Sequence, residues 1–167
     1  MDNFQVYKDI EARTGGEIYI GVAGPVRTGK STFIKRFMEL MVLPKLPEGH
    51  LKAIARDELP QSAAGKTIMT TEPKFIPKEA AEIALEDGIT ARVRLVDCVG
   101  FMVEGAAGHE ENGEERLVKT PWYDHEIPFT QAAEIGTRKV IRDHSTIGIA
   151  VTADGSFGEL KRNDYLE

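Results

Sequence analysis

Cysteine, long apolar runs and an excess of positive charge are absent or nearly absent from this sequence. Its single cysteine, Cys98, cannot form a disulfide within the chain, so we expect a reducing, cytoplasmic environment. The first residues lack the basic and then apolar layout of a signal peptide. No run of about 18 apolar residues occurs, so we also expect no transmembrane segment.

Acidic residues outnumber basic ones by 27 to 21, which gives a net charge of −6. A chain with this balance has no general positive field to attract nucleic acid or an anionic membrane. We therefore expect no nucleic-acid partner. The length of 167 residues and the hydrophobic content of 41% are those of one ordinary globular domain.

The first part of the chain predicts a helix, a strand, a glycine turn and a second helix. Residues 4–10 have the apolar spacing of a short helix, and residues 17–23 form an apolar, β-branched run typical of a buried strand. Apolar residues then recur at helical spacing over 33–41, until Pro44 ends the helix.

The middle of the chain predicts a long loop followed by an antiparallel hairpin. Residues 44–77 are rich in proline and have no long periodic stretch, and a loop of that length is usually functional or disordered. Alternating residues over 83–85 and 89–96 flank an Asp-Gly turn at 87–88.

Further along, residues 101–128 form an acidic, glycine-containing stretch that we expect to be a loop. A helix that ends near Asp143, a fourth strand over 146–151 and the start of another helix over 158–167 follow. The sequence thus predicts an α/β fold with a mostly parallel sheet and one antiparallel hairpin, incomplete after its fourth strand.

Residues 24–31 match the Walker A pattern G-x-x-x-x-G-K-S/T, between a predicted strand and a predicted helix. In this context the backbone N–H groups and the helix N-terminus hold phosphates, Lys30 reaches the β- and γ-phosphates, and Ser31 offers a hydroxyl to Mg²⁺. The sequence therefore predicts a P-loop NTPase. The residues expected to contact the nucleotide are Gly24, Pro25, Val26, Arg27, Thr28, Gly29, Lys30, Ser31, Thr32 and, later in the chain, Gly100.

The predicted strand over 89–96 leads into Asp97, which begins a D-x-x-G motif that ends at Gly100. P-loop switch proteins carry their Walker B aspartate at this place. We expect Asp97 to hold Mg²⁺ through water and the N–H of Gly100 to face the γ-phosphate. A simple strand-end cap is the alternative for Asp97.

Thr70 and Thr71 lie between Ser31 and Asp97, in the predicted loop that returns over the phosphates. A threonine in such a loop completes the Mg²⁺ shell and orients the attacking water. The sequence does not distinguish between the two threonines, and ordinary loop residues remain the alternative.

Two expected features are missing. Phe101 follows D-x-x-G where many GTP-hydrolysing proteins have a glutamine that positions water, so we expect slow hydrolysis. The motif N/T-K-x-D, which recognises guanine, does not occur after Val151, so no motif indicates which nucleotide base binds. We expect the charge that assists catalysis to come either from Arg27 or from a neighbouring molecule, and a solvent-exposed arginine at the loop apex is the alternative for Arg27.

Several longer runs resemble the stage IV sporulation protein A family, the coat morphogenetic ATPases of spore-forming bacteria. The resemblance covers essentially the whole chain, which we therefore take as the first part of an ATPase domain over 1–167. The runs that carry it are residues 12–16, 29–35, 57–75, 120–123 and 132–154.

This resemblance implies a domain of the translation-factor-related GTPase class that uses ATP and Mg²⁺. It matches Lys30 to the Walker A lysine, Asp97 to the Walker B aspartate, and Thr70 and Thr71 to the sensor threonines. It further implies that hydrolysis drives self-assembly around the forespore, in the mother-cell cytoplasm. A small amphipathic membrane-anchoring peptide and other coat proteins are implied as partners of regions absent here.

Other functions compatible with the residues are a GTP-dependent switch that controls a partner, a P-loop phosphotransferase and a structural protein with an inactive site. The antiparallel hairpin argues against a phosphotransferase, and intact Lys30, Ser31 and Asp97 argue against an inactive site.

Overall fold

The computed structural model describes residues 15–26, 28–60, 73–84, 90–102, 110–111 and 114–152. The helices predicted over 4–10 and 158–167 and the turn predicted at 87–88 lie outside the described residues.

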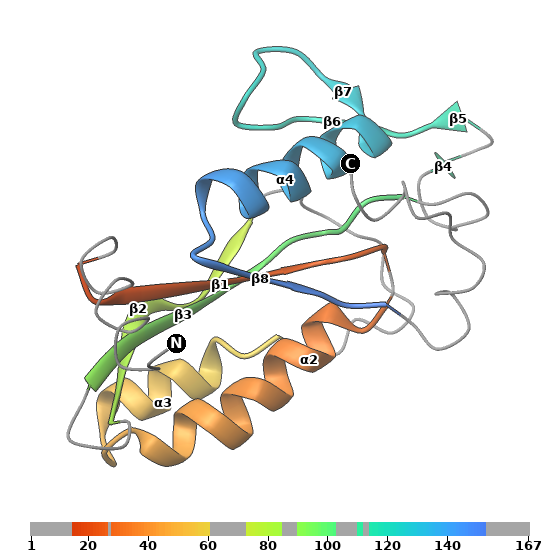
Figure 1. Cartoon of the computed structure of the whole chain (residues 1–167). Helices are drawn as coiled ribbons and strands as arrows, with labels where there is room; N and C mark the ends of the chain where they lie inside the picture. Colours follow the sequence, from red (N-terminus) through yellow and green to blue (C-terminus); the bar gives the residue numbers. More distant parts are fainter. Residues whose placement is uncertain are drawn as a thin grey trace.

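A four-stranded sheet in the order β2-β3-β1-β8 forms the centre of the molecule (Figure 1). Strand β1 (Glu17–Ala23) pairs in parallel with both β3 (Thr90–Asp97) and β8 (Ile147–Ala150). Strand β2 (Lys74–Ala84) pairs antiparallel with β3. The prediction of a mostly parallel sheet with one antiparallel hairpin is therefore confirmed.

Helices cover both faces of this sheet. Helix α2 (Lys30–Phe37) continues into the π-helical segment η1 (Met38–Val42) and the 3₁₀ turn η2 (Leu43–Lys45), so the helical segment ends one residue after Pro44, where it was predicted to end. Helices α2 and α3 (His50–Asp57) lie on one face, and α4 (Phe129–Asp143) lies on the other (Figure 1).

The predicted long loop contains regular structure at both of its ends. Helix α3 (His50–Asp57) lies within it and was not predicted, although Leu51, Ile54 and Ala55 have helical spacing. Strand β2 begins at Lys74, nine residues before Ile83, where the hairpin was predicted to start. Pro77 obscured the first half of β2, yet proline is tolerated there because β2 is an edge strand.

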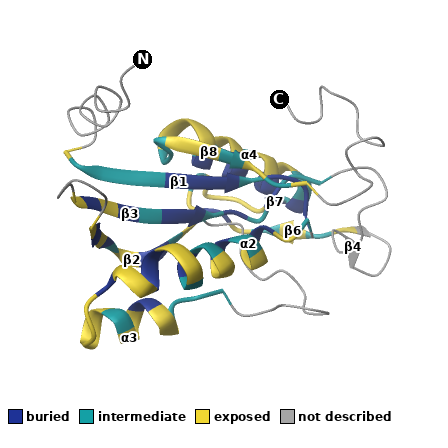
Figure 2. Ribbon diagram, turned by 60° about the horizontal axis from the view of Figure 1, so that its bottom comes forward, coloured by how far each residue is buried: buried dark blue, intermediate teal, exposed yellow. Residues whose placement is uncertain are grey.

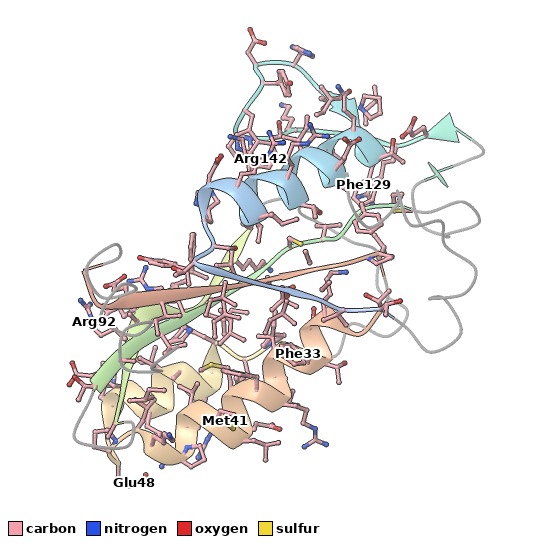
Figure 3. All side chains as sticks on the ribbon, viewed as in Figure 1. Phe33, Met41, Glu48, Arg92, Phe129 and Arg142 are labelled. Atoms are coloured by element: carbon pink, nitrogen blue, oxygen red, sulfur yellow. The ribbon has the colours of Figure 1, made fainter. Side chains whose placement is uncertain are left out.

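The larger core lies between the sheet and the helices α2 and α3. Figure 2 shows buried segments on the sheet and exposed residues on the outer sides of these helices, and Phe33 packs between α2 and the sheet (Figure 3). The alternation of β1 and β3 places Val22, Val93 and Leu95 in this core. Ile34 and Met38 of the helix fill it from the other side.

The predicted acidic loop is partly ordered into two short antiparallel pairs. Strand β4 (Glu110–Glu111) pairs with β5 (Glu114–Glu115), and β6 (Leu117–Val118) pairs with β7 (Ile127–Pro128). Within the part of the chain that the structure describes, no helix is both long and apolar enough to cross a membrane.

Candidate nucleotide-binding site

The predicted Walker A loop connects the carboxyl end of β1 to the first turn of α2. Its two glycines are required by geometry: Gly29 has φ +91°, and Gly24 has φ +150°. A Cβ on Gly24 would lie 2.1 Å from the carbonyl oxygen of Val151, after β8. The loop therefore passes so close to the neighbouring strand that only glycine fits at its start.

Lys30, the first residue of α2, points into the loop rather than into solvent. Its side chain is 5% exposed, and its Nζ donates a hydrogen bond of 2.6 Å to the carbonyl oxygen of Pro25. Thr28 Oγ1 donates to the same carbonyl at 2.8 Å. Burial lowers the pKa of Lys30, while nearby Cys98 and Asp97 act in the opposite direction. An anionic phosphate oxygen is a stronger acceptor for this buried ammonium group than a neutral carbonyl.

Asp97 and Ser31 meet at the end of the sheet, although 66 positions separate them in the chain. Ser31 Oγ donates a hydrogen bond of 3.0 Å to Asp97 Oδ2. Asp97 Oδ1 is buried and has no hydrogen-bond partner among the described residues. Burial raises the pKa of Asp97, and the bond from Ser31 and the charge of Lys30 oppose that rise.

These oxygen atoms fit Mg²⁺. The ion prefers oxygen ligands and is usually held by one or two protein groups, with water and phosphate oxygens completing its shell. The unpaired Oδ1 of Asp97 and the Ser31 hydroxyl offer such a set. Among the described residues no cluster of three His, Cys, Asp or Glu side chains forms a separate metal site.

The segment after β3 is joined to the Walker A loop. The Val26 N–H donates a hydrogen bond of 2.9 Å to the carbonyl oxygen of Phe101, so this N–H already has a partner within the protein. Gly100 has φ +92°, and a Cβ there would lie 2.4 Å from Lys30 Nζ and 2.3 Å from the Gly24 carbonyl oxygen. Gly100 thus allows the close contact of this segment with Lys30.

The structure brings together most of the residues predicted from the Walker A and D-x-x-G motifs, and Thr32 lies exposed in the first turn of α2. Arg27, Thr70 and Thr71 lie outside the described residues. The Pro25 carbonyl, which accepts two hydrogen bonds, could not be assigned this contact from sequence because a backbone acceptor has no residue signature.

Comparison with known proteins gives a consistent result. The family model described as stage IV sporulation protein A, ATPase domain, matches residues 1–167. The chain is 59% identical over 167 residues to stage IV sporulation protein A of Bacillus subtilis (strain 168) and 58% identical over 167 residues to that of Bacillus anthracis. Each match covers 100% of this chain and 34% of the relative, so the chain spans about a third of the length of these relatives. No solved structure matches significantly.

Proposed function

The chain belongs to the stage IV sporulation protein A ATPase-domain family, and from this membership we propose that it binds ATP with Mg²⁺ and hydrolyses it slowly. The observation that carries the proposal is the contact of Ser31 with Asp97 beside the buried ammonium group of Lys30. A lone Walker A match has no such partner. Here a hydroxyl, a carboxylate and an ammonium group converge at one loop.

Each group has a distinct role in this proposal. Lys30 exchanges its bond to the Pro25 carbonyl for phosphate oxygens, and the N–H groups of the loop and of the first turn of α2 bind the phosphates. Ser31 and Asp97 would hold Mg²⁺, which would neutralise the charge of the phosphates. Gly100 directs its N–H toward the γ-phosphate.

The remaining roles come from the sequence. In this proposal Thr70 or Thr71 would complete the metal shell and orient the attacking water, and Arg27 would act beside the phosphates. Phe101 has no group that positions water, which is consistent with slow turnover.

We assign the fold to the translation-factor-related GTPase class. The antiparallel pairing of β2 with β3, which places Asp97 at the end of the hairpin, supports this assignment. P-loop kinases have parallel neighbours at this position.

We propose the wider role for a longer protein that contains this domain, because the relatives are about three times as long as this chain. Relatives named stage IV sporulation proteins support a function in spore formation. In this proposal, hydrolysis drives self-assembly of the coat basement layer at the forespore surface, in the mother-cell cytoplasm. Other regions bind a small amphipathic membrane-anchoring peptide and other coat proteins.

The main alternative is a GTP-dependent switch that controls a partner, and equilibrium binding separates the two. Labelled ATP is bound to the chain in MgCl₂, and unlabelled ATP or GTP competes. We expect ATP to compete at least about tenfold better than GTP, a difference of roughly 1.4 kcal/mol. Preferential competition by GTP favours the switch, and absence of binding to the folded chain contradicts both functions.

A further inference from the structure

Asp97 and Cys98 are neighbours in sequence but face opposite sides of the sheet. Asp97 contacts Ser31 at the start of α2, whereas Cys98 packs with Val96 and with Val140 of α4. The Asp97 carboxylate thus lies on the α2 side and the Cys98 thiol on the α4 side.

The Cys98 thiol contacts groups on β1 and on α4, and the N–H of Gly100 and the charge of Lys30 also act on it. It is 6% exposed, and its Sγ donates a hydrogen bond of 3.3 Å to the carbonyl oxygen of Val22 on β1. Thr137 Oγ1, on α4, lies 3.8 Å from the sulfur and donates at 2.8 Å to the Ala133 carbonyl oxygen. Because a hydroxyl has one proton, the carbonyl receives the stronger bond and the sulfur the weaker one.

These contacts occur where the strand ladder stops. Val22 and Asp97 are the last residues paired between β1 and β3. The next described backbone bond between the two segments joins Val26 to Phe101. Between these two points, Cys98 ties the chain to β1 and to α4. Successive side chains of an extended chain point to opposite faces, so the anchor at Cys98 limits rotation of Asp97 away from Ser31.

We propose that Cys98 is a positioning residue whose thiol, held between the Val22 carbonyl and Thr137, directs the Asp97 carboxylate toward Ser31 and thereby sets the magnesium affinity of the site. This inference rests on the proposed Mg²⁺–ATP function. It extends the site to α4, a helix that carries none of the predicted nucleotide contacts.

A matched pair of variants separates this role from apolar packing. Cys98→Ser keeps a donor for the Val22 carbonyl, and Cys98→Ala removes it. Binding of labelled ATP is measured while MgCl₂ is titrated, and thermal unfolding verifies the fold. We expect Cys98→Ala to raise the half-saturating MgCl₂ concentration about tenfold, roughly 1.4 kcal/mol. Cys98→Ser should stay within about threefold of wild type, and metal-free ATP affinity should not change in either variant.

Thr137 gives a second and smaller test that leaves the thiol in place. Because Cys98 is the single cysteine, its rate of reaction with a thiol reagent reports how often the packing against α4 opens. We expect Thr137→Val to increase this rate and to raise the MgCl₂ requirement about threefold, and we expect Thr137→Ser to restore both. This pair decides the matter if Cys98→Ala does not fold.

The outcomes distinguish the two levels of the proposal. If Asp97→Asn abolishes the effect of MgCl₂ on ATP binding while folded Cys98→Ala responds as wild type does, the positioning role is wrong and the proposed function stands. If ATP binding by wild type itself does not respond to MgCl₂, both are wrong. A change in unfolding temperature alone, without a change in MgCl₂ requirement, also overturns the positioning role.

Discussion

The two faces of the sheet differ in what they bury. The face covered by α2 and α3 holds a continuous aliphatic core that includes Ile34, Met38 and Leu95. The face covered by α4 buries a separate, smaller cluster, Val96, Cys98 and Val140, beside the partly buried rings of Tyr19 and Phe75. Helix α4 also buries Phe129, Ala132 and Ala133.

The α4 face is also the more polar one. A Cβ on Gly21 would lie 1.9 Å from Ser145 Oγ and 3.1 Å from Val140 Cγ1, so the end of α4 approaches β1 very closely. Beyond α4, Arg92 forms an ion pair of 2.9 Å with Glu17. This face therefore combines close backbone contact with polar groups, where the other face uses apolar volume.

The two faces therefore contribute differently to the candidate site. Helix α2 both seals the large core and begins with Lys30 and Ser31, so the chemistry of the site is built on the more heavily packed face. Helix α4 buries its apolar residues outside that core and contacts the site through Cys98. Perturbing each face separately tests this difference.

The largest effect is expected from Lys30→Ala, because this buried ammonium group points into the loop that is proposed to hold the phosphates. Turnover of ATP should fall roughly 10²- to 10³-fold, the usual loss when one charge-stabilising donor is removed. Initial rates of phosphate release at saturating ATP measure the loss.

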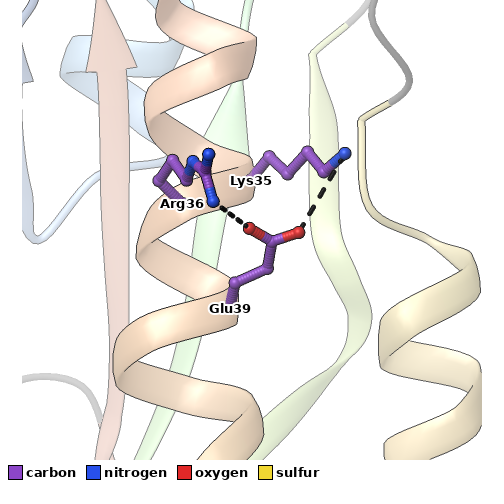
Figure 4. A network of polar contacts seen from close by, with 3 residues as sticks. All are labelled: Lys35, Arg36 and Glu39. Carbon is purple, nitrogen blue, oxygen red and sulfur yellow. Dashed lines mark hydrogen bonds and ion pairs between the residues drawn. The ribbon is translucent and has the colours of Figure 1, made fainter.

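Two lysines serve as controls for this prediction. Lys35, on the same helix, forms only a surface ion pair of 4.0 Å with Glu39, which also contacts Arg36 (Figure 4). Lys139 on α4 lies 5.7 Å from the Trp122 ring centre. Alanine at either position should leave turnover nearly unchanged, and an equal loss at Lys35 would contradict a specific role for Lys30.

Next in size is a difference in stability between two fully buried valines, Val42 on the α2 side and Val140 on α4. Val42→Ala should lower the free energy of unfolding by about 3 kcal/mol and Val140→Ala by about 1.5 kcal/mol, because a larger rigid core collapses less around a cavity. Urea unfolding of both variants measures this difference. Equal losses would show that a buried valine contributes the same free energy of unfolding on either face.

A smaller effect is expected from Gly100→Ala, since a Cβ there overlaps the Lys30 side chain. We expect ATP affinity to fall about tenfold, or roughly 1.4 kcal/mol. Gly16 is the matched control: its φ is +87° against +92° for Gly100, and no atom lies within 4 Å of its Cβ position. Gly16→Ala carries the same backbone strain and should bind ATP like wild type; weakened binding there would assign the loss to strain alone.

The smallest effect is expected from Asp97→Asn, which should raise the free energy of unfolding by about 1 kcal/mol at neutral pH, because a buried, partly unpaired carboxylate costs stability. Burial raises the pKa of Asp97 in the folded chain. Wild type therefore loses stability as pH rises from the unfolded pKa through the folded one, and the variant does not. Unfolding measured over acidic to neutral pH detects this; a variant that is less stable at neutral pH would contradict it.

Local patterns in the sequence predicted the elements whose apolar faces are clear. The apolar run of β1, the helical spacing of α2 and α4 and the alternation before Asp97 each correspond to an observed element. The Walker A and D-x-x-G motifs also indicated Lys30, Ser31 and Asp97 as one site, and the structure brings these side chains together.

The elements that were missed had short or interrupted local signals. The helical spacing of α3 is carried by Leu51, Ile54 and Ala55 alone, and the first half of β2 contains Pro77. Their formation depends on contacts with distant parts of the chain, since α3 packs beside β2, and β2 bonds to β3. Intrinsic propensity is a weak guide where such contacts decide the conformation.

The amino-acid sequence by itself determined the residue types at the phosphate loop, the need for glycine within it and the strand that ends at Asp97, because these depend on short-range stereochemistry and spacing. Three contacts depend on how the chain packs in three dimensions: the bond of Lys30 to the Pro25 carbonyl, the approach of Gly100 to Lys30, and the contact of Cys98 with Thr137. Cys98 and Thr137 are 39 positions apart in the chain, and the packing of α4 on the sheet brings them into contact. Such long-range packing has no local signature along the chain.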